Sequence, residues 1–186
     1  MEQPAPRQGL EAHHKTLLNT WRHAMNLVGP GAIQQHFDDA KHAANGLNPE
    51  GEWADLGTGA GFPGMVWAAL FPGLRIDLVD SRLKRCTFLQ EVLDRAGQPE
   101  GVRVLKTRVE DLPDHAYDGL TGRAFAPPDR LFDHAYRLLR AHGRLVMFLQ
   151  GGTEPPADAR FALESCSSYS IMGRARQVAF YRLRDR

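Results

Sequence analysis

The chain has 186 residues, of which 42% are hydrophobic, and a formal net charge of +1 at pH 7. That length suits one globular domain with a small extension and leaves no comfortable room for a second catalytic domain. The cysteines Cys86 and Cys166 lack CxxC or Cys/His spacing, which argues against a disulfide framework and a metal site. With no signal-peptide core and no run of about 18 apolar residues, we expect a cytoplasmic protein without membrane association.

The first 48 residues predict a short lead followed by a small helical cap. Residues 1–8 contain two prolines among polar neighbours, which is typical of a disordered lead. Between residues 9 and 48, apolar residues recur at spacings of three and four, a pattern that predicts two helices. The run Gly29-Pro30-Gly31 is expected to separate these two helices.

Residues 49–186 change to alternating strand-like and helix-like segments. This alternation predicts an α/β domain with a Rossmann-like, doubly wound and mostly parallel sheet. The strands are expected near residues 53–56, 76–79, 102–105, 117–121 and 144–149. Two further strand-like segments, 165–172 and 177–183, predict an antiparallel hairpin at the edge of the sheet.

The clearest helix of this region is expected at residues 82–96, with Gly97 as its stop. A second helix is expected to begin at Pro127 or Pro128, because a first helical turn tolerates proline. The apolar stripe of the first helix comprises Leu83, Cys86, Leu89, Val92, Leu93 and Ala96. Cys86 is therefore expected to be a small core residue.

The segment 53–64 is the most informative part of the sequence. A short apolar run is followed by three alternate glycines, Gly57, Gly59 and Gly61. This pattern predicts a strand that turns sharply into a helix, with no side chain to block the close approach of a ligand. Because the helix N-terminus offers free backbone N–H groups, the segment predicts a nucleotide-cofactor pocket.

Acidic residues are placed at the ends of the next two predicted strands. Asp80 ends the second strand, and Val109 and Glu110 follow the third. In a doubly wound sheet the ligand lies beyond the carboxyl ends of the strands. Asp80 could accept hydrogen bonds from two ribose hydroxyls, or it could cap the following helix, a role that Ser81 could equally fill.

The glycine loop differs from two common phosphate-binding motifs. It is one residue short of the dinucleotide fingerprint and lacks the Lys-Ser/Thr ending of a P-loop. With Asp55 before it, the loop instead resembles the first motif of S-adenosylmethionine-dependent methyltransferases. The resemblance implies S-adenosyl-L-methionine as the cofactor, with Asp55 facing its ammonium group.

A closer resemblance extends over residues 17–152. The segments that carry it are 55–64, 78–81, 84–85, 88–89, 108–110 and 122–126, together with Trp21 and Asn26-Leu27. They resemble the bacterial RsmG (GidB) family, which methylates N7 of a guanosine in the 16S ribosomal RNA of the small subunit. The resemblance implies the class I methyltransferase fold, and 16S ribosomal RNA or the 30S subunit as partner.

The residue pattern and the resemblance together give the candidate site. The cofactor-binding candidates are Asp55, Gly57, Gly59, Gly61, Phe62, Asp80, Ser81, Val109, Glu110 and Arg123. Arg123 and Asn26 are the candidate catalytic residues. Arg123 follows the fourth predicted strand and could orient substrate or cofactor, or it could form a salt bridge to Asp118 or Asp129.

The implied reaction suits the residue types that are present. Guanine N7 has an exposed lone pair, so its attack on a methyl group needs in-line placement and exclusion of water but no general base. Methylation at pyrimidine C5 would call for a nucleophilic thiolate. Cys86 is predicted on a helix face and Cys166 in the tail, which argues against that route.

Charge and two substitutions bear on the substrate. From Arg123 onward all 11 basic residues are arginines, against 6 Asp and Glu. Arginine suits bidentate contact with phosphate, but it also serves as an ordinary solubilising surface residue. Gly122 and Gln150 stand where the family's pattern has Ser and Lys. The alternatives are a methyltransferase acting on a small molecule or another RNA, and a non-catalytic RNA-binding or cofactor-sensing module. We expect the protein to be a monomer.

Overall fold

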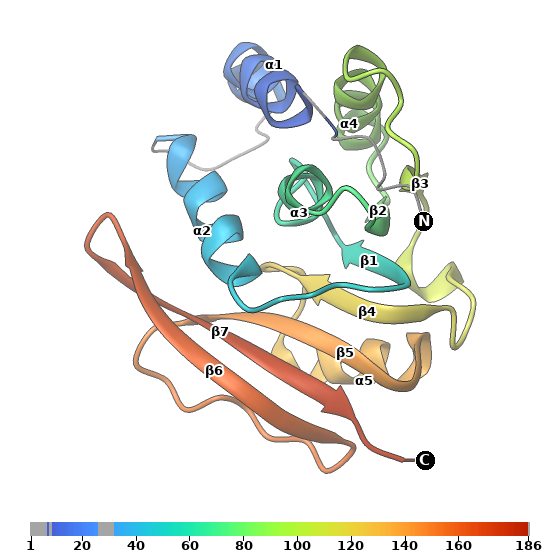
Figure 1. The fold of residues 1–186 in the computed structure, drawn as a ribbon, viewed down its shortest axis with the longest axis vertical. Coiled ribbons are helices and arrows are strands. Elements are labelled where there is room, and N and C mark those ends of the chain that lie inside the picture. Colours follow the sequence, from blue (N-terminus) through green and yellow to red (C-terminus); the bar gives the residue numbers. More distant parts are fainter. Residues whose placement is uncertain (1–6, 8, 26–31, 186) are drawn as a thin grey trace.

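One seven-stranded sheet organises the computed structural model, which describes residues 7, 9–25 and 32–185. The strand order is β3-β2-β1-β4-β5-β7-β6 (Figure 1). The strands are β1 (Glu52–Leu56), β2 (Arg75–Asp80), β3 (Val102–Lys106), β4 (Tyr117–Gly122), β5 (Leu139–Gln150), β6 (Phe161–Ile171) and β7 (Arg174–Leu183). The helices are α1 (Leu10–Met25), α2 (Gln34–Ala44), α3 (Gly64–Leu70), α4 (Leu83–Arg95) and α5 (Pro128–Leu138), with a 3-10 turn η1 (Val109–Asp111).

Strands β1 to β5 run parallel, and β7 lies antiparallel between β5 and β6. The expected doubly wound, mostly parallel sheet with an antiparallel hairpin is therefore confirmed. The two hairpin strands are longer than expected. They are joined by Met172 and Gly173, both with positive φ, a combination that suits a tight hairpin turn.

Helices cover both faces of the sheet, which explains why the central strands β1, β2 and β4 are almost wholly buried. Helices α1 to α4 pack on one face and α5 on the other (Figure 1). Successive residues of β1 alternate between these cores: Trp53 joins the cluster under α1 to α4, whereas Ala54 and Leu56 join the cluster under α5.

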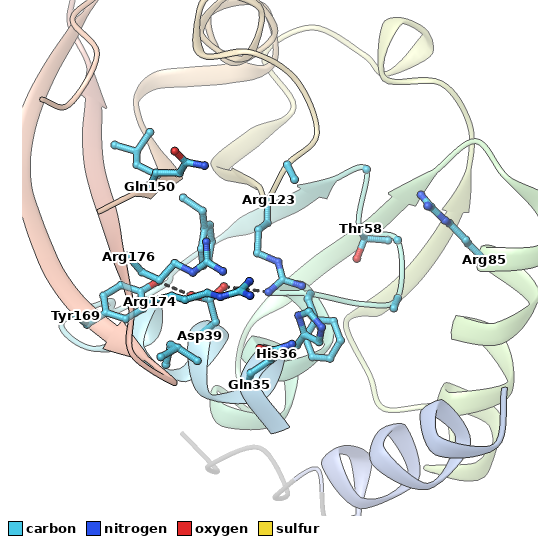
Figure 2. Close-up of a pocket in the computed structure, with 18 residues that line it drawn as sticks. Gln35, His36, Asp39, Thr58, Arg85, Arg123, Gln150, Tyr169, Arg174 and Arg176 are labelled. Atoms are coloured by element: carbon cyan, nitrogen blue, oxygen red, sulfur yellow. Dashed lines mark hydrogen bonds and ion pairs between the residues drawn. The ribbon is translucent and has the colours of Figure 1, made fainter. Parts of the chain in front are cut away.

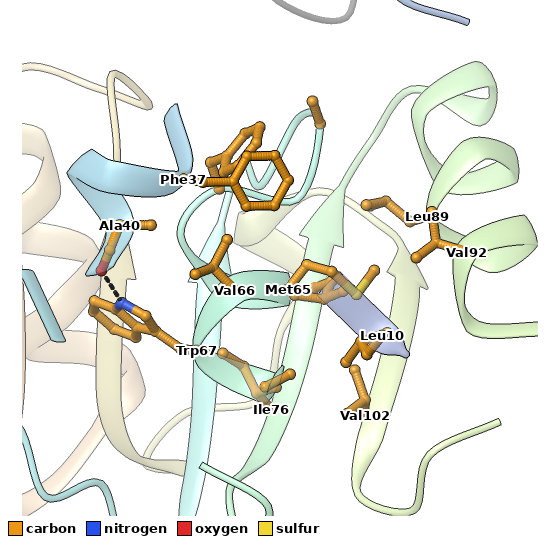
Figure 3. Packing of buried hydrophobic residues seen from close by; sticks show 14 of the residues in the cluster. Leu10, Phe37, Ala40, Met65, Val66, Trp67, Ile76, Leu89, Val92 and Val102 are labelled. Atoms are coloured by element: carbon orange, nitrogen blue, oxygen red, sulfur yellow. Dashed lines mark hydrogen bonds between the residues drawn. The ribbon is translucent and has the colours of Figure 1, made fainter. Parts of the chain in front are cut away.

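Helix α3 lies at the centre of the larger core (Figure 3). Its residues Met65, Val66 and Trp67 are all fully buried. The Trp67 indole N–H donates to the Ala40 carbonyl of α2 at 2.8 Å, so the buried polar atom of this side chain is satisfied. Full burial of one large apolar side chain contributes roughly 1.5–3 kcal/mol. The contact fixes α2 beside the glycine loop, because α3 follows that loop directly.

The predicted helical cap corresponds to α1 and α2. Both helices contribute side chains to the core they share with the sheet, including Leu18 and Phe37. The expected break at Gly29-Pro30-Gly31 and the candidate residue Asn26 lie outside the described residues. So does the expected lead of residues 1–8, apart from Arg7.

Arg7 is held by backbone carbonyls at the far end of the sheet. Its guanidinium donates to the carbonyl oxygens of Ala68 at 2.8 Å, Leu74 at 2.6 Å and Glu100 at 2.7 Å. Burial lowers the pKa of Arg7, and the charge of Glu100 opposes that effect. Arg7 therefore links the N-terminal side of α1 to the segments that flank β2.

Two local expectations differ from the structure. Leu83, the first residue of α4, is 64% exposed and does not join the buried apolar stripe of this helix. Strand β5 begins at Leu139 and not near residue 144, since Leu139 already pairs with Tyr117. A register irregularity between Tyr117 and Gly119 accommodates the extra residues. Cys86 is buried, as expected.

Candidate functional site

Two adjoining cavities lie beyond the carboxyl ends of the parallel strands. The larger is about 720 Å³ and the smaller about 440 Å³. Gly57, Arg85 and Ala124 line both.

In the described part of the chain, no helix is long and apolar enough to cross a membrane. Within the same residues, no group of three His, Cys, Asp or Glu is placed to hold a metal ion.

The glycine loop borders the larger cavity through Gly57 and Gly59, and Gly57 borders the smaller cavity as well, whereas Gly61 lines neither. Gly57, Gly59 and Gly61 have φ values of +63°, +61° and +90°, which favour glycine strongly. A Cβ at Gly57 would lie 2.4 Å from the Phe125 ring. The backbone can therefore follow this path, and leave room for a ligand beside it, only without side chains at these positions.

Asp55 lines neither cavity and instead holds the glycine loop through hydrogen bonds. Its Oδ2 accepts hydrogen bonds from the Thr58 hydroxyl at 2.7 Å and the Gly64 backbone N–H at 2.8 Å, while its Oδ1 is buried without a partner among the described residues. Burial raises the pKa of Asp55 to about 6, and the two hydrogen bonds oppose that increase. Asp55 thus ties the loop to the start of α3.

Asp80 ends β2, and its contacts relate to both roles considered for it, ribose binding and capping of α4. Its Oδ1 accepts from the Arg82 backbone N–H at 2.9 Å, which supports the start of α4. Its Oδ2 accepts from the Gly59 N–H and from Arg85 Nη1, both at 3.1 Å. Asp80 also lines the smaller cavity, so the same residue supports the start of α4 and borders that cavity.

Ser81, Val109 and Glu110 also line the smaller cavity. Val109 is buried, whereas the Glu110 carboxylate is exposed and lies 3.5 Å from Arg108. A backbone hydrogen bond at Glu110 lowers the pKa of its carboxyl group, and Arg108 adds to the effect. The structure thus brings the predicted strand-end acids Asp80 and Glu110 to one cavity.

Arg123 projects into the larger cavity, where it pairs with a residue of the cap (Figure 2). Its Nη1 donates to Asp39 Oδ2 at 3.0 Å, and its guanidinium lies 5.1 Å from the centre of the Phe62 ring. The Tyr169 hydroxyl donates to the other Asp39 oxygen at 2.7 Å. The considered salt bridge from Arg123 to Asp118 or Asp129 was wrong, because α2 brings Asp39 closer.

Two histidines of the cap were not singled out from the sequence. His14 is fully buried, and its Nε2 donates to the Ala60 carbonyl of the glycine loop at 2.6 Å. Burial lowers the pKa of His14 to about 4. His36 lines the larger cavity beside Phe62, and burial followed by the charge of Arg123 lowers its pKa to about 4. Both rings are therefore neutral at pH 7.

Four arginines face the larger cavity, and the sequence identified one of them. Besides Arg123, the lining includes Arg85 from α4 and Arg174 and Arg176 from the start of β7. Gln150, at the end of β5, lies beside them. For Arg174 and Arg176 the sequence signal was the excess of arginine from Arg123 onward, which did not say where these side chains meet.

Solved structures with the same fold support the assignment of the architecture. A mutant of MtNAS in complex with S-adenosylmethionine superimposes with a TM-score of 0.65 at 15% identity, covering 94% of this chain and 72% of that one. The cyclase SpnF gives a TM-score of 0.67 at 14% identity, covering 99% and 98%. At these identities the likeness shows the fold alone.

Curated relatives are much closer in sequence. "Ribosomal RNA small subunit methyltransferase G" of Caulobacter vibrioides is 40% identical over 146 residues, which are 74% of this chain and 65% of that protein. The proteins of the same name from Symbiobacterium thermophilum and Novosphingobium aromaticivorans are 38% and 42% identical, over 72% and 64% of this chain and 60% and 55% of their own lengths. The chain thus spans between about half and two thirds of these relatives.

The family model of GidB, "rRNA small subunit methyltransferase G", matches residues 9–171. This match includes the glycine loop, Asp80, Glu110 and Arg123, so it covers both cavities apart from the start of β7. The chain therefore belongs to the GidB family.

Proposed function

We propose that this protein transfers a methyl group from S-adenosyl-L-methionine to N7 of a guanosine in 16S ribosomal RNA. The observation that carries the proposal is the pair of adjoining cavities in a chain of the GidB family: one is lined by strand-end acids, the other by arginines. The proposal includes a monomer that acts in the cytoplasm, on 16S RNA or the 30S subunit, without a metal.

The smaller cavity fits the adenosine part of the cofactor. Asp80 offers carboxylate oxygens to hydroxyl donors such as those of a ribose, and Arg85 would give up part of its contact when they bind. The exposed Glu110 carboxylate, which lines the same cavity, offers further acceptors. The positive φ of Gly57 and the close Phe125 ring leave a surface without a Cβ. When bound, the cofactor would supply an electrophilic methyl group.

The larger cavity fits a nucleophile that needs no base. Among the described residues that line it, Asp39 already accepts hydrogen bonds from Arg123 and Tyr169. His36 is a weak base, because its pKa is about 4. Because guanine N7 attacks with its own lone pair, the residues need only hold the base in line and exclude water. The contacts of Arg123 with Asp39 and Phe62 support a role for this side chain in holding the base.

The test is methyl transfer from radiolabelled S-adenosylmethionine to 30S particles or 16S RNA from cells that lack this gene. We expect label in 16S RNA at close to one methyl group per molecule. Asp80→Asn should abolish transfer because it weakens cofactor binding, whereas Asp94→Asn, on the exposed face of α4, should not. No transfer to either RNA by protein that binds S-adenosylhomocysteine would contradict the proposal.

A further inference from the structure

The arginines that line the larger cavity outnumber the carboxylates that pair with them. Its lining holds four arginines and one carboxylate, that of Asp39. Arg123 pairs with Asp39, and Arg85 pairs with Asp80 at 3.1 Å. Within the described ranges, Arg174 and Arg176 make no side-chain hydrogen bond or ion pair. Two guanidinium groups thus face this cavity without an anionic partner.

The hairpin geometry places these two side chains together. Arg174 and Arg176 are two residues apart in β7, so they project from the same face of the strand, roughly 7 Å apart along it. Figure 2 shows both reaching from the hairpin toward Asp39 and Arg123. Arg174 is exposed and Arg176 is half-buried, so the pair runs from the rim of the cavity into its interior.

The neighbouring strand offers no counter-charge to this pair. Arg176 lies directly opposite Gln150 in the ladder between β5 and β7. Residues opposite each other in an antiparallel pair have Cβ atoms about 5 Å apart, on one face. A cation at position 176 therefore occupies almost the same place as the lysine that the family's pattern has at position 150. The match to the family ends at residue 171, before either arginine.

We propose that Arg174 and Arg176 bind backbone phosphates of the single-stranded RNA segment that carries the target guanosine. Guanidinium groups form bidentate, charge-assisted hydrogen bonds with phosphate oxygens, and such contacts fix the position of a strand without reading its bases. The inference rests on the proposed function, since it concerns the substrate of the same cavity. These arginines are positioning residues: they hold the strand, while Arg123 lies nearer the glycine loop.

The experiment compares Arg174→Gln/Arg176→Gln with Arg184→Gln, an exposed arginine beyond the other end of β7. Binding of a labelled single-stranded oligoribonucleotide is measured at several salt concentrations. Each lost phosphate contact should reduce the salt slope of log K by about 0.7, and the double variant should bind at least about tenfold more weakly. Melting temperature and affinity for S-adenosylhomocysteine should match those of the wild type.

In methyl transfer, the double variant should raise KM for 16S RNA at least about tenfold while kcat changes little. Gln150→Lys should restore part of the affinity lost in Arg176→Gln, because the two positions share one face of the ladder. An unchanged salt slope and KM in the double variant would overturn the inference while leaving the proposed function intact. Loss of RNA binding in the variant, with no transfer by the wild type, would support the phosphate site and reject the proposed function.

Discussion

Replacement of Asp55 by Asn should change how stability depends on pH. Burial raises the pKa of Asp55 from 3.8 to about 6, so the folded state favours the protonated carboxyl group. The stabilisation of the folded state by protonated Asp55 is complete below pH 3.8 and is lost as the pH rises through 6. A difference of this size corresponds to about 3 kcal/mol in the free energy of unfolding. Asp55→Asn removes the titration and retains an oxygen that can accept from Thr58 or Gly64.

The assay is urea unfolding of wild type and Asp55→Asn at a series of pH values. The difference between the two isolates one group from all others that titrate. From pH 4.5 to 7.5 the free energy of unfolding of the variant should rise by about 2 kcal/mol relative to wild type, since part of the transition lies below pH 4.5. Thr58→Val should steepen the wild-type dependence, because the Thr58 hydroxyl bond lowers the pKa of Asp55. Parallel curves for wild type and Asp55→Asn would refute this reasoning.

Three further changes test other parts of the site. Gly57→Ala should cost about 1–2 kcal/mol and abolish the thermal shift with S-adenosylhomocysteine, since its Cβ would meet Phe125 at 2.4 Å. Gly97→Ala, with φ +79° and open space, should cost similar stability but keep that shift. Asp39→Asn should lower the free energy of unfolding by about 1–3 kcal/mol in urea, because two donors share its carboxylate; an unchanged midpoint would count against the link. His14→Gln should reduce the loss of stability on acidification from pH 7 to pH 4.5, because burial lowers the pKa of His14 from 6.5 to about 4 and the unfolded chain takes up the proton first; equal losses would contradict this.

Much of the sheet could be predicted from local patterns. Alternation of apolar runs located β1 to β4 closely, and the glycine loop indicated the turn into α3, because these features depend on neighbours in sequence. The start of β5 could not be placed in this way. Its first residue pairs with Tyr117 across a ladder irregularity, which no local pattern reports.

The site was predicted where it depends on strand ends and not where it depends on distant pairs. Asp80 and Glu110 follow strands, so parallel topology alone brings them to one edge. The link between Arg123 and Asp39 joins residues 84 positions apart, and Tyr169 lies 130 positions from Asp39. Such pairs depend on how α2 and the hairpin pack, which a single sequence does not reveal.

The most direct test of the central claim is mass spectrometry of nucleosides from 16S RNA incubated with the purified protein and S-adenosylmethionine. The RNA is taken from cells that lack this gene. We expect N7-methylguanosine at one position, close to one per RNA, with an equal amount of S-adenosylhomocysteine. Methylation of another atom or another RNA, or none by protein that binds the cofactor, would contradict the account.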